Sequence, residues 1–109
     1  MRIWDLSPDR LCRAHLLAEH RELHGLWVIL TQGRKAYANH PETNRWRGKL
    51  KALYLRHEAL AAEMRRREYR HGTPLDPALA TGLARQDAFV DTPERQIEIL
   101  RARGCDCLV

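Results

Sequence analysis

The chain has 109 residues, of which 44% are hydrophobic and 30% charged, and this composition indicates one folded domain. No stretch approaches the roughly eighteen apolar residues of a membrane helix, and the amino-terminal residues lack the apolar core of a signal peptide. We therefore expect a cytoplasmic protein with no membrane partner. Lysine and arginine number 19 against 14 acidic residues, and the net charge of +5 favours a polyanionic partner, most often nucleic acid.

The first predicted helix follows a strong start signal. Ser-Pro-Asp at positions 7–9 supplies an N-cap, a proline at the first helical position and an acid in the first turn. We predict a helix over residues 8–32, ended by Gly33, after a short extended arm over residues 1–6. Residues 26–30 are apolar on every side of this helix, so we expect it to occupy a central position.

Two further helices are predicted along the rest of the chain. Residues 34–43 read as a basic loop, and a second helix spans residues 44–69 with an apolar inner face. A connector with a short helix at 77–83 leads to a third helix, which begins at Thr92-Pro93 and ends at Gly104. The residues expected to face the core are Leu50, Leu53, Tyr54, His57, Leu60, Ala61 and Met64, and then Ile97 and Leu100.

No segment shows the alternation of a strand, and no internal repeat is present. The sequence therefore predicts an all-α fold, a compact single domain over residues 1–109 with three main helices joined by long loops. We expect this domain to be a monomer.

One acidic residue stands out on the first predicted helix. Helical spacing places Glu22 on a mostly apolar face with Leu11, His15, Ala18, Leu26 and Ile29. A carboxylate on a core-facing stripe is costly unless it is paired or used chemically. Two interpretations remain open at this point. Glu22 is either a structural acid paired with Arg2, Arg21 or Arg56, or the carboxylate of an active site.

The cysteines and histidines give only weak metal signals. The three cysteines, Cys12, Cys105 and Cys107, are an odd number and argue against a disulfide framework. A zinc site usually needs four ligands, and no second pair matches the last two cysteines, so free thiols are favoured. His20 and His24 lie one helical turn apart, but no third ligand is evident. We expect neither a metal nor another cofactor.

A longer pattern resembles a known family. The first helix contains the run His15-Leu16-x-Ala18-Glu19-x-Arg21-Glu22-Leu23, and Arg2-Ile3 stands at the start of the chain. Both match the phage-type pyrimidine-dimer DNA glycosylases, also called endonuclease V, and the spacing from the amino terminus to Glu22 matches as well. The second helix, with Lys49, Leu50, Leu53, Arg56 and Leu60, gives a weaker match, and the resemblance ends after Tyr69.

The resemblance implies a DNA-repair glycosylase with abasic-site lyase activity, acting on damaged double-stranded DNA. In this family the terminal α-amine attacks the damaged nucleotide and forms a Schiff base. Arg2 argues for retention of Met1, whose α-amine then takes the nucleophile's place. Glu22 matches the catalytic glutamate, while Arg2, His15 and Arg21 match residues that hold the DNA. Lys35, in the basic loop, is a further candidate for DNA contact.

An enzyme of this kind must expose the target nucleotide, and an aromatic wedge from Trp4, Tyr37 or Trp46 would help. Because of two departures from the family, the resemblance does not indicate which DNA lesion the protein acts on. Gly25 replaces a family arginine one turn beyond Glu22, and residues 103–109 do not resemble the family's aromatic, basic tail. Alternatives are a non-catalytic nucleic-acid-binding module on the same scaffold, or a basic protein that binds an acidic protein partner.

Overall fold

The computed structural model describes residues 2–109, and Met1, the predicted nucleophile, lies outside them. The described part of the chain is all-helical and has no strand, which confirms the predicted fold class of three main helices with long loops. In chain order the elements are the 3-10 turn η1 (Pro8–Arg10), α1 (Arg13–Gln32), α2 (Pro41–Asn44), α3 (Leu50–Arg66), the 3-10 turn η2 (Pro77–Leu79) and α4 (Pro93–Arg103).

Helix α1 begins five residues later than predicted, because the start signal forms a separate 3-10 turn. The Ser7 hydroxyl donates to the Asp9 carboxylate and makes no side-chain cap to the backbone. Leu11 then adopts an extended conformation, with φ −81° and ψ 136°, and its side chain enters the core with only 2% exposure. Gly33 ends α1 in the left-handed region, at φ 65°, as predicted.

The second helix is shorter than predicted, since it runs over Leu50–Arg66 as α3 and not over residues 44–69. Gly48, at φ 72°, interrupts the helical backbone, so α3 begins only at Leu50. Pro41–Asn44 forms the single turn α2, part of which was wrongly assigned to a loop. His40 caps this turn, since its Nδ1 atom accepts a 3.1 Å hydrogen bond from the Glu42 N–H.

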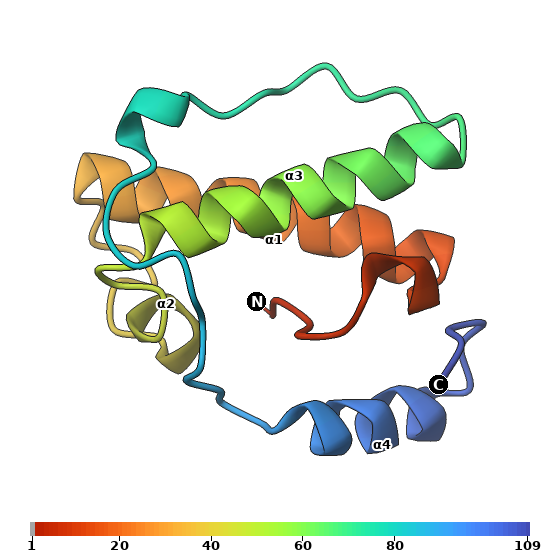
Figure 1. Cartoon of the computed structure of the whole chain (residues 1–109). Helices are drawn as coiled ribbons and strands as arrows, with labels where there is room; N and C mark the ends of the chain where they lie inside the picture. The colour runs from red at the N-terminus through yellow and green to blue at the C-terminus, as the bar shows by residue number, and fades with distance from the viewer. Residues whose placement is uncertain (1) are drawn as a thin grey trace.

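Helices α1 and α3 lie side by side and enclose much of the core (Figure 1). The predicted inner face of α3 is confirmed at Leu53, His57, Leu60, Ala61 and Met64, all of which are buried. Helix α4 docks through the fully buried Leu100, with Ile97 partly buried beside the core. The short helix expected over residues 77–83 is only the 3-10 turn η2.

The amino-terminal segment, residues 2–6, lies between the α1–α3 pair and α4 (Figure 1). It is neither helix nor strand, yet Ile3, Trp4 and Leu6 are only 1%, 3% and 6% exposed. The predicted arm is therefore an extended core segment. Its apolar side chains supply the driving force for burial, and its backbone groups then need partners.

Three side chains from three different elements accept the backbone N–H groups of this segment. The Ile3 N–H donates to Glu42 at 3.2 Å, the Trp4 N–H to Glu19 at 2.9 Å, and the Asp5 N–H to Gln96 at 2.7 Å. All three acceptor residues are buried. Because consecutive amides are held by α2, α1 and α4, the course of the amino-terminal segment is fixed at each residue.

None of the helices described is both long enough and apolar enough to cross a membrane.

Candidate active site

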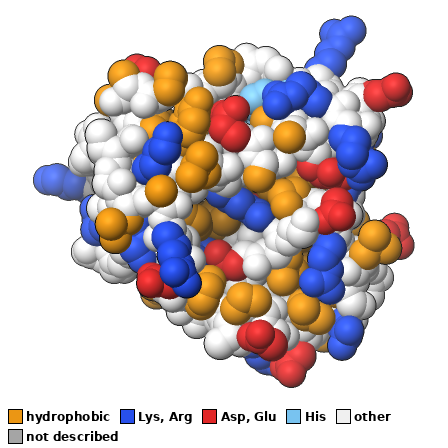
Figure 2. Space-filling model, in the orientation of Figure 1, with side chains coloured by type: hydrophobic (Ala, Val, Ile, Leu, Met, Phe, Trp, Pro, Cys, Tyr) orange, Lys and Arg blue, Asp and Glu red, His pale blue; other side chains and the backbone are white. Residues whose placement is uncertain are grey.

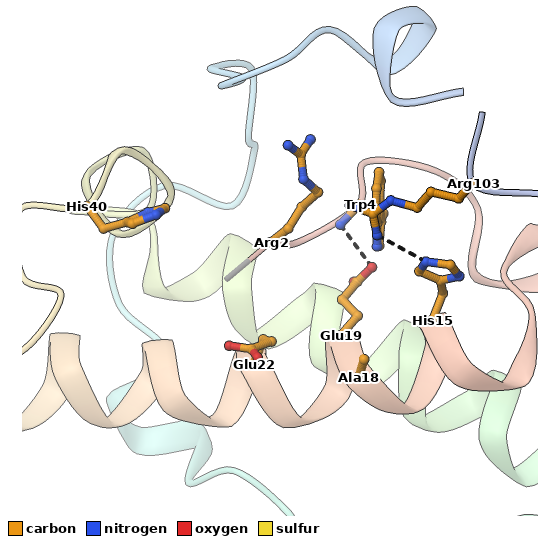
Figure 3. A pocket seen from close by; sticks show the side chains of 8 residues that line it. All are labelled: Arg2, Trp4, His15, Ala18, Glu19, Glu22, His40 and Arg103. Carbon is orange, nitrogen blue, oxygen red and sulfur yellow. Dashed lines mark hydrogen bonds between the residues drawn. The ribbon is translucent and has the colours of Figure 1, made fainter. Parts of the chain in front are cut away.

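A pocket of about 420 Å³ opens between α1, the amino-terminal segment and the end of α4. Figure 2, in the orientation of Figure 1, shows a hollow near the centre of this face of the molecule, where basic, acidic and hydrophobic side chains meet. Figure 3 shows the side chains from these elements around the pocket. The lining residues are Arg2, Trp4, His15, Ala18, Glu19, Glu22, His40 and Arg103.

The deeply buried carboxylate of this site is Glu19, and not Glu22 as the helical spacing predicted. Glu19 is 1% exposed and forms two hydrogen bonds with the Arg56 guanidinium, at 2.7 and 3.0 Å. Its Oε1 atom also accepts the Trp4 N–H (Figure 3). Burial raises the pKa of Glu19, and Arg56 acts in the opposite direction. The sequence analysis offered a paired structural acid as one interpretation of Glu22. In the structure Glu19 has this role instead.

Glu22 lies one turn further along α1, half-buried, with its carboxylate on the pocket wall (Figure 3). None of the ion pairs among residues 2–109 involves it. The earlier alternative, pairing with Arg2, Arg21 or Arg56, is thus wrong for the described residues, because Arg56 is engaged by Glu19 and Arg2 by Asp91. Glu22 is a carboxylate available to a molecule in the pocket.

Two guanidinium groups line the pocket beside the Trp4 ring. That of Arg2 lies 5.0 Å from the ring centroid and that of Arg103 lies 5.5 Å from it. Arg2 also pairs with Asp91 at 2.9 Å, at about one-third exposure of each side chain. A guanidinium carries five N–H donors and its contact with an aromatic face uses none of them, so each arginine keeps donors for an anion beyond the one that its protein partner takes.

His15 completes this basic wall. Its ring packs edge-to-face on Trp4, with centroids 5.7 Å apart, and its Nε2 atom lies 3.4 Å from a guanidinium nitrogen of Arg103 (Figure 3). Burial, and then the positive charge of Arg103, lower the pKa of His15. The imidazole is therefore neutral near pH 7 and acts in the pocket through hydrogen bonds.

The structure brings together only some of the predicted site residues. Arg2, His15 and Glu22 line one pocket, whereas Arg21 and Lys35 are exposed and lie outside its lining. The sequence missed Arg103, which reaches the pocket from the far end of the chain and carries no local signal. His40 was also missed, although its position before Pro41 could have suggested a helix cap.

Of the three aromatic residues suggested as a wedge, two are unsuitable. Trp4 and Trp46 are 3% and 2% exposed, and the Trp46 ring nitrogen donates to Glu42. Tyr37 is 67% exposed, and its ring centroid lies 6.4 Å from that of His40 at the pocket wall. Tyr37 is thus the exposed member of the three, and it lies beside a residue of the pocket lining.

The metal signals are stronger than the sequence suggested. His20 and His24 are joined by His57 and His71, so the third and fourth potential ligands, which were not evident from the sequence, come from distant segments. The two carboxyl-terminal cysteines meet Cys12 and His15. Apart from His15, none of these side chains lines the pocket.

The fold and the pocket define a small helical domain with a mixed charged pocket. Its lining includes the guanidinium groups of Arg2 and Arg103 and the Glu22 carboxylate, which has no ion-pair partner among residues 2–109. The sequence model of the pyrimidine dimer DNA glycosylase family matches residues 1–77, and the chain belongs to this family. Membership implies a DNA glycosylase with damaged DNA as its substrate. Searches for similar curated proteins and for similar solved structures found no match. Helix α4, with Arg103, lies beyond the matched residues.

Proposed function

We propose that this protein is a DNA-repair N-glycosylase with abasic-site lyase activity on damaged duplex DNA. In this proposal the Met1 α-amine is the nucleophile and Glu22 assists bond cleavage and elimination. One observation carries the proposal. Three buried side chains hold consecutive amides of residues 3–5, and Arg2 consequently lines the same pocket as Glu22.

Schiff-base formation in this pocket requires an amine that is partly unprotonated at neutral pH. An α-amine has a pKa of about 7.7–8.0, against about 10.4 for lysine, so it supplies a nucleophile without further perturbation. The chain contains three lysines, Lys35, Lys49 and Lys51, and none belongs to the pocket lining described for residues 2–109. The Lys49 ammonium is instead bonded to Gln86 at 2.7 Å. Both points favour the α-amine.

The first chemical step forms a bond from the amine nitrogen to the anomeric carbon of the damaged nucleotide and breaks the glycosidic bond. The base leaves with the electron pair and takes up a proton. Glu22 stabilises the positive charge that develops on the sugar. Loss of the amine proton and opening of the sugar ring then give a protonated Schiff base.

The second step is β-elimination. Glu22, directly or through water, removes a proton from the sugar carbon next to the imine. The electrons of that C–H bond form a double bond and expel the 3′ phosphate, which breaks the strand. Water hydrolyses the remaining Schiff base and releases the enzyme. A half-buried carboxylate without a cationic partner among residues 2–109 suits both tasks.

DNA binding uses the basic wall. Arg2 and Arg103 supply donors for the phosphates beside the extruded nucleotide, and His15 contacts the DNA from the same wall. Tyr37 occupies the space that the nucleotide leaves in the stack. Arg21 and Lys35, which are exposed outside the pocket, contact the flanking backbone in this proposal.

The test is a strand-cleavage assay on two duplexes, one with an abasic site and one with a pyrimidine dimer. Glu22→Gln should abolish both cleavage reactions while DNA binding and helix content are retained. Glu98→Gln is the control, since Glu98 is an exposed acid on α4 that does not line the pocket. Cleavage by Glu22→Gln at the wild-type rate would refute the catalytic role. Binding without cleavage by the wild-type protein would favour a non-catalytic binding module.

A further inference from the structure

Five of the six histidines and all three cysteines gather in two clusters, each of which includes at least one histidine of α1. Each cluster contributes four potential metal-ligand atoms that lie within 4.8 Å of one another. His40 is the histidine left outside both. Apart from His15, no member of either cluster has a part in the proposed glycosylase chemistry, so their assembly calls for a separate explanation.

The histidine cluster joins three segments of the fold. His20 and His24 lie one turn apart on α1, His57 faces them from α3, and His71 comes from the segment after α3. Their Nε2 atoms form a closed set of short separations: His20–His24 3.2 Å, His24–His57 3.2 Å, His57–His71 3.3 Å and His71–His20 2.9 Å.

These separations fit a four-coordinate metal site. Nitrogens at about 2.0–2.1 Å from a zinc ion, at the corners of a tetrahedron, stand about 3.4 Å apart. Hydrogen bonds alone do not explain the convergence, because a neutral imidazole offers one donor and one acceptor. The four nitrogens satisfy at most two hydrogen bonds among themselves, and the Thr73 hydroxyl, 3.3 Å from the His24 Nε2 atom, can add one more. A cation at their centre satisfies all four lone pairs.

The groups around the cluster prepare it for a cation. The Nδ1 atom of the fully buried His57 lies 3.0 Å from the Glu58 carboxylate, which holds the proton on Nδ1 and directs the lone pair of Nε2 inward. Neutral imidazoles are the form that binds metal.

The second cluster joins the two ends of the fold. The Nδ1 atom of His15 lies 3.1 Å from the Cys12 sulfur and 3.4 Å from the Cys107 sulfur, and Cys105 supplies the fourth position. A sulfur and a nitrogen bound to one tetrahedral zinc stand about 3.6 Å apart. The Cys12 N–H donates to the Cys107 sulfur at 3.1 Å, as backbone amides do toward metal-bound thiolates.

We propose that the chain binds two ions of the zinc class, one through His20, His24, His57 and His71 and one through Cys12, His15, Cys105 and Cys107. The first ion fastens the segment after α3 to both long helices. The second ties the carboxyl-terminal tail to the start of α1. Three cysteines and one histidine form a common structural zinc site, and four imidazoles also suit zinc.

The thiolate site adjoins the proposed active site through one residue. An imidazole that binds a metal through Nδ1 keeps its proton on Nε2. His15 would then present an N–H donor to the pocket, and Arg103 would no longer find an acceptor at that nitrogen. The ion thus determines which hydrogen bonds this wall offers to a phosphate.

The test is the zinc content of the purified full-length chain after stripping with a chelator, reloading with zinc sulfate under reducing conditions, and desalting. We expect two zinc ions per chain in the wild-type protein. His71→Gln and Cys107→Ser should each retain one, and His40→Gln should retain two. Two zinc ions in Cys107→Ser, with one in His71→Gln, would overturn the thiolate site. Two zinc ions in His71→Gln, with one in Cys107→Ser, would overturn the histidine site. Zinc near zero in the loaded wild-type protein would overturn both.

Cobalt loading of the wild-type protein keeps the proposal testable if a variant fails to fold. The thiolate site should produce a thiolate-to-cobalt charge-transfer band, and both sites should produce the visible absorption of four-coordinate cobalt. Absence of the charge-transfer band would contradict the thiolate site. Helix content, measured by circular dichroism with and without zinc, gives a readout independent of catalysis.

Discussion

The Trp4 backbone N–H donates a 2.9 Å hydrogen bond to the Glu19 carboxylate, and this bond fastens the amino-terminal segment to α1 inside the pocket. Glu22 lies one turn further along the same helix. The two acids therefore have different tasks. Glu19 is buried and paired, and it holds the segment in place, whereas Glu22 faces the space where a substrate would bind.

Substitution of Glu19 should lower stability rather than act on chemistry alone. Glu19→Gln leaves the largely buried Arg56 guanidinium, 15% exposed, without its carboxylate, and breaking a buried pair costs about 3 kcal/mol. Glu22→Gln should change the free energy of unfolding by no more than about 0.5 kcal/mol. Urea unfolding of both variants checks this. Equal stability of Glu19→Gln and the wild-type protein would show that Glu19 does not anchor the segment.

The acid stability of the protein should depend on Glu63. Hydrogen bonds from Arg66, and then from Arg67, lower the pKa of Glu63 to about 2, from an ordinary value of 4.5. Because the folded-state pKa lies below the unfolded-state value, this stabilisation is present above about pH 4.5 and is lost as the pH falls toward about 2. Glu63→Gln should flatten the decline of the free energy of unfolding in this window. An unchanged pH profile would contradict the assignment.

Tyr37 should matter for base excision and not for folding. Stacking of one base on an aromatic ring is worth about 1–3 kcal/mol, so Tyr37→Ala should lower the excision rate by about tenfold. Tyr37→Phe keeps the ring and should retain the rate. The measurement is single-turnover excision from a duplex with one lesion. Loss of activity in both variants would point to the hydroxyl instead of to stacking.

Arg2 should contribute one phosphate contact. Its ion pair with Asp91 is partly exposed, so its loss should affect stability little. Arg2→Gln should weaken binding to undamaged duplex DNA and make the slope of log K against log salt shallower by about one. Arg65→Gln is the matched control, because Arg65 is exposed at the end of α3 and does not line the pocket. Equal slopes for wild type and Arg2→Gln would exclude the contact.

The helices could be predicted where local signals decide the structure. Thr92 caps α4 by accepting the Arg95 N–H at 3.2 Å, and Gly33 and Gly104 end α1 and α4 in the left-handed region, as the sequence indicated. The start of α1 could not be predicted in the same way. Burial of Leu11 in an extended conformation, a tertiary effect, overrides the Ser-Pro-Asp signal.

The site was only partly predictable. Helical spacing placed Glu22 on the apolar face of α1, but the buried stripe of the helix contains Glu19 instead. Arg56, on another helix, provides the charge partner that allows Glu19 to be buried there. Arg103, His57 and His71 approach from distant parts of the chain, and no short motif links them to α1. Local spacing found His20 and His24, but only the fold brings their partners to them.

Borohydride trapping on a duplex with an abasic site, followed by mass mapping of the attached residue, tests the central claim most directly. The account predicts a covalent adduct at the α-amine of Met1, lost in Glu22→Gln. The same adduct should persist in a variant with Lys35, Lys49 and Lys51 changed to arginine. An adduct at one of these lysines, or bound DNA without any adduct, would contradict the proposed nucleophile.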